Sequence, residues 1–351
     1  MVTNSLPARH NTGPITWQQE LATAFTEPAA LLQALGLDPA QLPDGGLEAL
    51  RKSAALFPLR VPASFVRRMR YGDFNDPLLR QVLPLGQEQL QQAGFSADPL
   101  EEAAARLAPG LLQKYPGRAL LVTTGACAVH CRYCFRREYD YGADSDSEQG
   151  GRWEAALAAL TADPSIEELI LSGGDPLALG NARLASLVQR AAQLPQLKRL
   201  RLHTRTPIVL PSRVDAGLLA LLAACPLQVI VVVHANHAAE IDEEVTASLK
   251  ALRATGAHLL NQSVLLAGVN DDATALAELS QALFAADTLP YYLFLLDRVN
   301  GTGHFEVPEA RAQALMRELN GRLPGYLVPR LVREIPGMPG KTPVSVGVAL
   351  S

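Results

Sequence analysis

The feature that most constrains the fold is an alternation of short apolar runs with helical stretches, which begins near Arg118. Runs of this kind are typical of parallel strands that are buried on both faces. The predicted strands are Ala119–Thr123, Glu168–Leu171, Arg199–His203, Gln228–Val233, Leu259–Leu266 and Tyr291–Leu296. The predicted helices lie near Gly151–Ala162, Asn181–Gln193, Ala216–Ala224, Asp242–Thr255 and Ala273–Ala286. We therefore predict an α/β fold, a partial (β/α)6 barrel with its chemistry at the carboxyl ends of the strands.

Further segments flank this barrel, so that three regions are predicted: a helical N-terminal region at 1–112, the barrel at 113–300 and a C-terminal segment at 301–351. Helical spacing of apolar residues supports the first region at Trp17–Leu35, Leu47–Leu56 and Leu100–Leu112. The C-terminal segment is expected to hold a helix near Pro308–Leu323, an apolar run at Tyr326–Val332 and a loop rich in Gly and Pro that carries Lys341.

The composition argues against several classes of partner. With 31 basic and 35 acidic residues the net charge is −4, which offers no electrostatic footprint for nucleic acid or an anionic membrane. No apolar run reaches the roughly 18 residues that would span a bilayer. The opening Met1–His10 lacks the basic and apolar blocks of a signal peptide, so a cytoplasmic location is expected.

Three of the four cysteines are clustered directly after the first predicted barrel strand, as Cys127, Cys131 and Cys134. In this Cys-x3-Cys-x2-Cys pattern, three thiolates on one loop can hold three irons of a [4Fe–4S] cube and leave the fourth iron open. An open iron can bind the amino and carboxylate groups of S-adenosylmethionine (SAM). Tyr133, just before the last cysteine, is expected to shield the cluster or contact the adenine of SAM.

A structural zinc site is the alternative interpretation of the triad, with His130 or Cys225 as fourth ligand. Structural zinc usually takes its ligands from two separated pairs and closes its coordination shell. Cys225 lies at the end of an apolar helix, where a buried inert thiol is the commoner case. The open three-ligand pattern therefore favours an iron–sulfur cluster.

A second candidate turn ends the second predicted strand, at Gly173, Gly174 and Asp175. The two glycines allow the backbone to approach a ligand closely. Asp175 could instead cap a helix that begins at Pro176. Both roles are compatible.

Lys341 lies in a loop with too much Pro and Gly for a regular element. Such a loop could bring an amine into the mouth of the barrel, where a desolvated lysine could bind an aldehyde cofactor. An exposed loop lysine is the alternative, since most lysines are exposed.

The chain resembles the lysine 2,3-aminomutase family of radical SAM enzymes over nearly its whole length. The segments that carry the resemblance are Tyr115–Arg118, Cys127–Arg137, Leu171–Pro176, Thr204–Pro207, His234–His237, Asn261–Leu266, Pro290–Tyr292, Asp297, His304–Phe305 and Gly340–Pro343. The resemblance implies a radical SAM barrel, a [4Fe–4S] cluster, SAM and pyridoxal 5′-phosphate (PLP).

The resemblance also implies roles for particular residues. Lys341 corresponds to the lysine that binds PLP, and Arg118 and Lys114 to residues that contact the PLP phosphate, with lysine at 114 where the family has arginine. Gly173, Gly174 and Asp175 correspond to the turn that holds the SAM amino group. His234 and Gln262 match residues near SAM, although either could be a satisfied polar group inside the barrel.

Three residues correspond to the family's substrate-binding side chains. Arg136 matches the arginine that holds the substrate carboxylate, for which a guanidinium has the right geometry. Asp297 matches the carboxylate that receives the ε-ammonium of lysine. Glu334 stands where the family's free-lysine enzymes have a second aspartate, so the extra methylene moves that carboxylate.

Glu334, an end at Ser351 and the sequence 291–305 resemble the branch of the family that supplies (R)-β-lysine for modification of elongation factor P. The resemblance implies L-lysine as substrate, a reductant protein such as flavodoxin or ferredoxin, and a functional link to elongation factor P and its ligase. Three alternatives remain: a catabolic free-lysine 2,3-aminomutase, a radical SAM enzyme without PLP, and a non-enzymatic Fe–S or zinc module.

Overall fold

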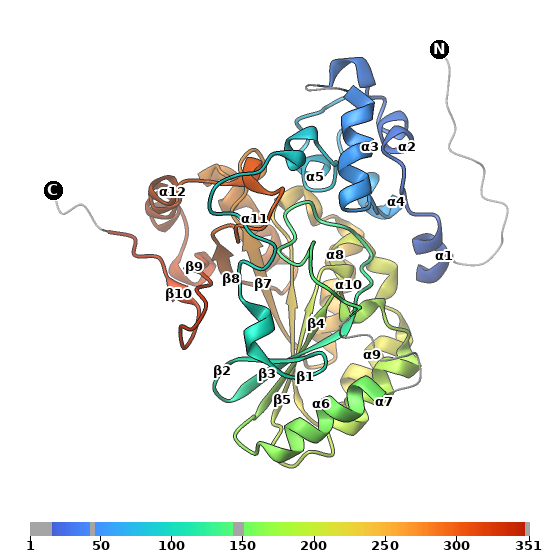
Figure 1. Ribbon diagram of the computed structural model, residues 1–351, viewed down its shortest axis with the longest axis vertical. Helices are drawn as coiled ribbons and strands as arrows, with labels where there is room; N and C mark the ends of the chain where they lie inside the picture. The colour runs from blue at the N-terminus through green and yellow to red at the C-terminus, as the bar shows by residue number, and fades with distance from the viewer. Residues whose placement is uncertain (1–15, 43–45, 143–150, 348–351) are drawn as a thin grey trace.

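The computed structural model describes residues 16–42, 46–142 and 151–347, and its centre is one sheet of ten strands in chain order (Figure 1). The segment Met1–His10, on which the signal-peptide prediction rests, lies outside these residues. The strands are β1 Arg106–Ala108, β2 Leu111–Tyr115, β3 Arg118–Thr124, β4 Glu168–Gly173, β5 Arg199–Thr204, β6 Gln228–Val233, β7 His258–Val264, β8 Leu289–Phe294, β9 Arg330–Arg333 and β10 Thr342–Pro343.

Strands β3 to β9 are parallel and follow one another in the sheet without a reversal. Within the described residues the pairing does not close the sheet on itself. Helices connect successive strands: α6 Gly151–Ala162, α7 Asn181–Ala191, α9 Ala216–Ala223, α10 Glu243–Ala254, α11 Ala273–Ala285 and α12 Glu309–Arg322. This arrangement confirms the predicted α/β fold and partial barrel, and the six predicted strands correspond to β3 to β8.

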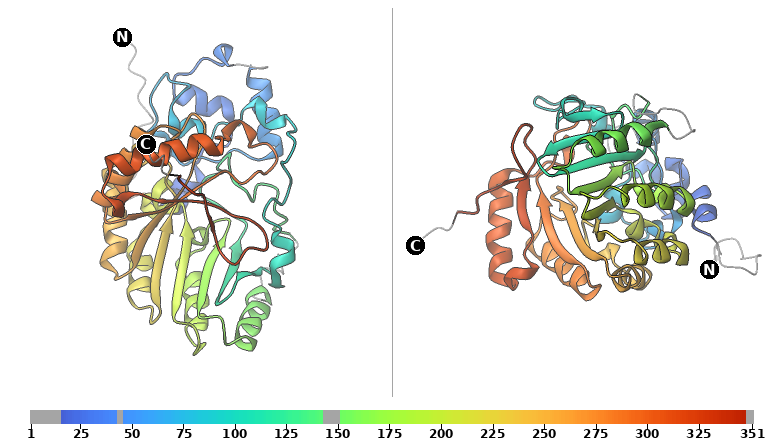
Figure 2. Two further views of the ribbon diagram at one scale, coloured as in Figure 1. Left: turned by 90° about the vertical axis from the view of Figure 1, so that its left-hand side faces the viewer. Right: turned by 90° about the horizontal axis from the view of Figure 1, so that it is seen from below.

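Side chains alternate along each barrel strand, because successive residues of a strand point to opposite faces. In β5, Leu200 and Leu202 belong to the apolar core under the outer helices, whereas Arg201 and His203 line an internal cavity. The same core contains residues from α6, α7, α9 and α10, which cover the outer face of the sheet (Figure 2). The inner face is therefore free to carry polar groups.

The connecting helices begin where the sequence places capping residues. The Asp215, Asp242 and Asp272 side chains accept hydrogen bonds from backbone N–H groups in the first turns of α9, α10 and α11. An aspartate at this position satisfies donors that the helix itself leaves unpaired.

The described part of the N-terminal region carries several short helices and lies over one end of the barrel (Figure 1). Its elements are α1 Trp17–Ala22, α2 Pro28–Ala34, η1 Pro39–Gln41, α3 Gly46–Leu56, α4 Ala63–Val66, α5 Pro77–Arg80, η2 Gly86–Gln89 and η3 Glu102–Ala105. Their apolar side chains form a core that also takes in Ala128 and Val129 of the cysteine loop. The N-terminal helices therefore support the loop that carries the cysteines.

The prediction that Leu100–Leu112 is helical is wrong. After the short turn η3, the chain forms β1 and β2, an antiparallel pair whose second strand joins β3. Gly110 makes this turn possible with a φ of 71°, a conformation that favours glycine. The fully buried Leu111 packs into the barrel core, so tertiary pairing outweighs the local helical pattern.

The C-terminal segment joins the sheet rather than forming a separate layer (Figure 2). Only the last residues of the predicted apolar run Tyr326–Val332 lie in β9, which is parallel to β8, and β10 returns antiparallel to β9. The remaining short elements are η4 Pro176–Ala178, α8 Thr206–Val209, η5 Pro211–Arg213, η6 Ala238–Glu240, η7 Gly303–Phe305 and η8 Gly325–Leu327.

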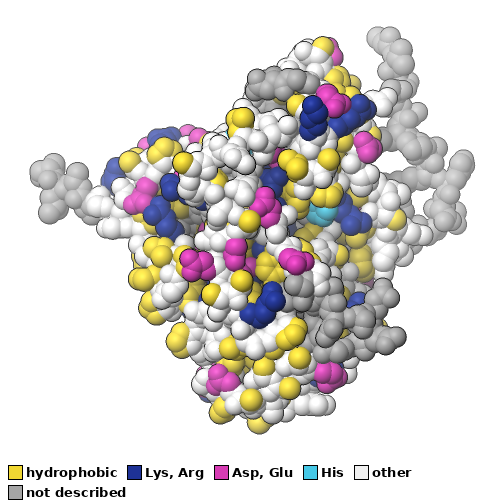
Figure 3. Space-filling view, viewed as in Figure 1, with side chains coloured by type: hydrophobic (Ala, Val, Ile, Leu, Met, Phe, Trp, Pro, Cys, Tyr) yellow, Lys and Arg dark blue, Asp and Glu magenta, His cyan; other side chains and the backbone are white. Residues whose placement is uncertain are grey.

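In the described parts of the chain, each helix is too short or too polar to cross a bilayer. On the face of the molecule in Figure 3, acidic and basic side chains are interspersed.

Candidate functional site

A cavity of about 520 Å³ opens at the carboxyl ends of the barrel strands, and every site residue predicted above lines it. The three cysteines come from the loop after β3, and Lys341 from the turn before β10. The sequence alone could not establish this meeting, because the two segments lie far apart in the chain.

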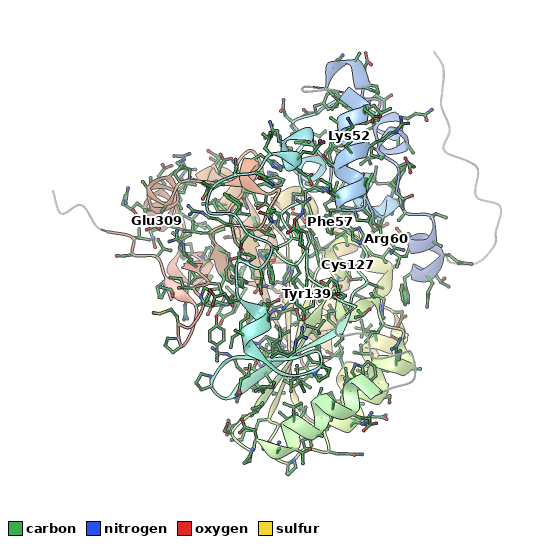
Figure 4. All side chains as sticks on the ribbon, viewed as in Figure 1. Lys52, Phe57, Arg60, Cys127, Tyr139 and Glu309 are labelled. Atoms are coloured by element: carbon green, nitrogen blue, oxygen red, sulfur yellow. The ribbon has the colours of Figure 1, made fainter. Side chains whose placement is uncertain are left out.

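The cysteine loop is held by the N-terminal helices. The backbone N–H of His130 donates to the carbonyl of Arg60 at 3.0 Å, and that of Arg132 donates to the carbonyl of Gln81 at 2.9 Å. Figure 4 shows Cys127 between Phe57 and Tyr139, where the N-terminal helices meet the barrel. The loop therefore has fixed anchor points outside the barrel.

The surroundings of the cysteines do not favour a zinc ion. The His130 ring nitrogen Nδ1 lies 2.9 Å from the carbonyl oxygen of Pro58, and Cys225 packs against the outer core away from the cavity. In the described ranges, the structure brings no three His, Cys, Asp or Glu side chains close enough to hold one metal ion. His130 and Cys225, the two residues considered as a fourth zinc ligand, therefore have other surroundings.

The glycines at the end of β4 allow a close backbone approach, and their neighbour is the cysteine loop. A Cβ atom on Gly174 would lie 2.3 Å from the carbonyl oxygen of Ala126, and one on Gly173 would lie 2.7 Å from that of Thr124. The N–H of Gly174 donates to the Thr124 carbonyl at 2.7 Å. Glycine here lets the turn after β4 pack directly on the loop that carries the cysteines.

Asp175 has the capping role described as an alternative. Its carboxylate accepts from the backbone N–H of Leu177 at 2.9 Å, at the start of η4. It also accepts from the Thr204 hydroxyl at 2.7 Å and from the backbone N–H of Arg205 at 2.8 Å. The side chain thus joins the ends of β4 and β5, and the prediction that this turn holds SAM stays a prediction.

Lys341 reaches the cavity because of the pairing of β9 and β10. Thr342 pairs with Arg333, so the next residues along the two strands, Lys341 and Glu334, face each other. Their side chains form an ion pair. The ammonium of Lys341 also lies over the rings of Phe294 and Tyr115, at 5.2 Å and 5.5 Å from their centroids.

Further charged side chains continue from this pair across the cavity. Lys114 Nζ lies 3.1 Å from Glu334 Oε1 and 3.0 Å from Glu102 Oε1. Glu102 receives two hydrogen bonds of 2.7 Å from the guanidinium of Arg136. Lys341, Glu334, Lys114, Glu102 and Arg136 therefore form a continuous chain of alternating charge.

This surrounding shifts several pKa values. Loss of water contact and the neighbouring Lys114 lower the pKa of Lys341 to about 7. Burial raises the pKa of Asp297 to about 6, although Lys341 and Lys114 oppose the shift. Burial also favours the protonated form of Glu102, but Arg136 and Lys114 outweigh it and lower that pKa to about 2. Near neutral pH the Lys341 amine is thus partly uncharged, as an amine that binds an aldehyde must be.

The guanidinium of Arg136 is held by side chains of the protein itself. Nε and one terminal nitrogen of its guanidinium donate to the carboxylate of Glu102. The other terminal nitrogen lies 3.1 Å from the Ser172 hydroxyl. A substrate carboxylate at Arg136 must therefore share or replace these contacts. Its predicted role is untested by this geometry.

The ends of the later strands place imidazoles on the cavity wall. His234, after β6, lies 2.8 Å from the side-chain nitrogen of Gln262 in β7. Burial lowers the pKa of His234 to about 3. His203 of β5 lies beside it, with ring centroids 6.0 Å apart, and its buried Nε2 lacks a hydrogen-bond partner within the described structure. Both imidazoles are neutral at pH 7.

Among the residues of the wall that sequence reasoning missed are Glu102, His203 and Arg205. Glu102 follows a segment without a motif, so no local signal marks it. His203 is near the end of β5, and Arg205 follows that strand within the Thr-Arg-Thr-Pro segment. Their position at the carboxyl end of a barrel strand was the available signal.

Part of this site matches a known family model. Residues 115–207, which include the three cysteines, match the family model of a 4Fe-4S single cluster domain. A solved radical SAM methyltransferase from Sphaerobacter thermophilus is 18% identical, with 64% of this chain and 68% of that chain covered and a TM-score of 0.44. That structural likeness is too distant to bear on function.

Relatives over the whole chain define the family. L-lysine 2,3-aminomutase of Escherichia coli (strain K12) is 46% identical over 99% of this chain and 98% of that protein. The Haemophilus influenzae enzyme of the same name is 44% identical over 93% and 94%, and that of Clostridium subterminale 36% identical over 80% and 67%. The chain belongs to the L-lysine 2,3-aminomutase family, whose members are isomerases.

Proposed function

We propose that this protein is a radical SAM, PLP-dependent isomerase that converts L-α-lysine to (R)-β-lysine for the modification of elongation factor P. The observation that carries the proposal is the shared cavity, which has the cysteine triad and Lys341 in its wall. Hydrogen transfer between a radical source and a substrate held on PLP requires the two centres to face one space.

The residues present fit the cofactors. Cys127, Cys131 and Cys134 are free thiols on one loop and would hold the cluster. The turn at Gly173, Gly174 and Asp175 lies against this loop, which suits binding of SAM beside the cluster. His234 and Gln262 lie on the same cavity wall and would contact SAM.

The opposite part of the cavity fits PLP. Lys341 would bind the aldehyde, and its lowered pKa of about 7 supports this role. Arg118 lies over the Tyr115 ring, with its guanidinium carbon 4.7 Å from the centroid, in the neighbourhood of Lys341. Arg118 and Lys114 would bind the phosphate, Arg118 with a planar fork and Lys114 as a point charge.

The substrate would lie between the two cofactors. Arg136 would receive the carboxylate of lysine, and Asp297 and Glu334 its ε-ammonium. In the structure the carboxylate of Glu334 pairs with the ammonium of Lys341. The same carboxylate could therefore pair with the ε-ammonium of the substrate lysine. Removal of the positive charge on Lys341 would release Glu334 for the substrate.

When bound, the cluster and SAM supply the one-electron chemistry that activates a C–H bond, and PLP supplies an aldehyde for the migrating amino group. The chain's own contribution is to bind, orient and exclude water. The cavity wall combines charged ends with the aromatic rings of Tyr115, Tyr292 and Phe294, which limit solvent around the reacting groups.

The proposed destination of the product rests on the branch resemblance and on Glu334. An electron would come from a reductant protein such as flavodoxin or ferredoxin, and a separate ligase would attach β-lysine to elongation factor P. We place these steps in the cytoplasm, where a reducing environment keeps exposed thiols free for a cluster.

A direct test uses enzyme that has been reconstituted anaerobically with iron, sulfide, PLP, SAM and dithionite. L-lysine should be converted to β-lysine, detected by mass spectrometry, with R configuration after chiral derivatisation. Addition of the ligase and elongation factor P should then add one β-lysyl group to the factor. Fast turnover of free lysine, with elongation factor P of unchanged mass in cells with and without the gene, would favour the catabolic alternative.

The lowered pKa of Lys341 predicts a pH dependence for PLP attachment. The attachment rate should rise with pH to a midpoint near 7 and then level off, because the neutral amine reacts. At pH 7 a substantial fraction of the Lys341 amines would be neutral, whereas an ordinary lysine is almost entirely charged. Stopped-flow absorbance after mixing apoenzyme with PLP measures this profile.

Lys114→Gln provides the matched variant for this measurement. The positive charge of Lys114 contributes to the lowered pKa of Lys341, so its removal should move the midpoint upward. The midpoint separates this effect from any loss of phosphate affinity. A wild-type rate that still rises above pH 9 would contradict the assignment of Lys341 as the reactive amine.

A further inference from the structure

Arg205 is a buried cation beside the cysteine loop that the proposed reaction does not use. Its guanidinium lies at the end of β5, and the residue is 5% exposed. One terminal nitrogen donates to the sulfur of Cys131 at 2.8 Å and also to the Tyr133 hydroxyl. The other donates to Gln81 at 2.7 Å and to Glu240 at 3.0 Å. Arg205 thus connects a predicted cluster ligand with two elements outside the loop.

The position of Arg205 is fixed from its backbone. Its N–H and that of Thr206 donate to the carboxylate of Asp175, at 2.8 Å and 3.0 Å. The Thr204 hydroxyl donates to the same carboxylate at 2.7 Å. The start of the Arg205 side chain is therefore tied to the turn after β4.

Glu240 is fixed in a similar way. It is fully buried and accepts from the backbone N–H groups of Asn236 at 2.8 Å and His237 at 3.1 Å. The Gln81 side chain donates to the same oxygen at 3.1 Å. With these contacts Glu240 cannot move away from Arg205, so the pair keeps one orientation relative to the cysteine sulfur.

This geometry has an electrostatic consequence for an iron–sulfur cluster. Reduction adds one negative charge to the cluster and its thiolates. A guanidinium stays charged at all working pH values, and in a buried site its attraction for that charge is screened little. Hydrogen bonds to cluster sulfurs and nearby charge are the means by which proteins set the reduction potential.

We propose that Arg205 is a positioning residue that holds Cys131 for the cluster and raises its reduction potential, and that Glu240 limits this increase. The inference rests on the cluster of the proposed function. It assigns to Arg205 a part in accepting the electron that starts the reaction. The oxidised cluster takes one electron from the reductant, and no bond to Arg205 forms or breaks.

The test is an EPR-monitored potentiometric titration of reconstituted wild-type, Arg205→Gln, Arg205→Lys and Glu240→Gln proteins, with dithionite as reductant and without lysine. Arg205→Gln removes the positive charge and should lower the ratio of reduced to oxidised cluster about tenfold at a fixed potential, which is about 59 mV for one electron. Arg205→Lys retains the charge and should recover most of this loss.

Glu240→Gln should shift the potential in the opposite direction, because it removes a negative charge near the same sulfur. Mere disturbance of the fold would not give opposite signs in the two variants. Arg213→Gln is the control for loss of a buried arginine: Arg213 is fully buried and donates to the carbonyls of Leu177 and Leu179, but it does not line the cavity. The reduction potential of the cluster in the Arg213→Gln protein should equal that in the wild type.

The outcomes separate the inference from the function on which it rests. Wild-type protein that takes up no iron and sulfide would overturn the proposed function and the inference with it. A cluster in the wild type whose potential is the same in Arg205→Gln and Glu240→Gln would overturn the inference alone. Shifts of the same sign in both variants would also overturn it.

Discussion

Replacement of Lys341 with methionine is expected to reduce formation of β-lysine by about 10³-fold or more, since the amine that binds PLP would be absent. Methionine keeps much of the length and apolar contact of the lysine stem against Phe294 and Tyr115. The cluster should still form, because the cysteines lie on a separate loop. The measurements are product by mass spectrometry, and iron and sulfide content for the same preparation.

Lys250→Met is the matched control, because Lys250 lies exposed on α10, away from the cavity. It should retain wild-type activity and PLP content. Full activity of Lys341→Met without bound PLP would contradict the proposed cofactor and would favour a radical SAM enzyme that does not use PLP.

Replacement of Cys127, Cys131 or Cys134 with alanine is expected to abolish activity and to lower iron and sulfide to background. Three thiolates hold three of the four irons, so the loss of any one leaves only two protein ligands for the cluster. Cys225→Ala is the internal control, since this thiol packs against the outer core. It should keep both the cluster and the activity.

Metal analysis of the anaerobic proteins checks this result, together with the cluster absorbance and the yield of β-lysine. About one zinc per chain without sulfide in the wild type would identify a zinc site instead. Loss of cluster in Cys225→Ala, with an intact triad, would mean that the fourth cysteine takes part.

The barrel could be predicted from the sequence because its signals are local. Strands such as β6 are continuous apolar runs, and the helices between them show their own periodicity. The segment Leu100–Leu112 carried a similar local signal and was wrong, because pairing of β2 with β3 decided its structure. β10, with only two residues, also depends on a partner strand, so its own sequence could not reveal it.

The site residues also fall into two groups, those that a local sequence pattern predicts and those that only tertiary contacts bring to the cavity. The cysteine triad was predicted from spacing along one loop, and Lys341 only through family resemblance, because the pairing of β9 and β10 brings it to the cavity. Glu102 and Arg205 contact partners distant in sequence, Arg136 and Cys131. A single sequence does not show such pairings, so these residues could be recognised only in the three-dimensional structure.

The anchoring of the cysteine loop on Gln81, Arg60 and the core around Ala128 links two equilibria. Binding of a cluster or metal ion to the three thiols therefore also stabilises helices α1–α5, because those helices hold the cysteine loop from outside the barrel. Removal of the group bound by the thiols should therefore cause the N-terminal helices to unfold under conditions in which the barrel strands stay folded. Protease nicking between residues 46 and 105 would report metal loading without any spectroscopic label.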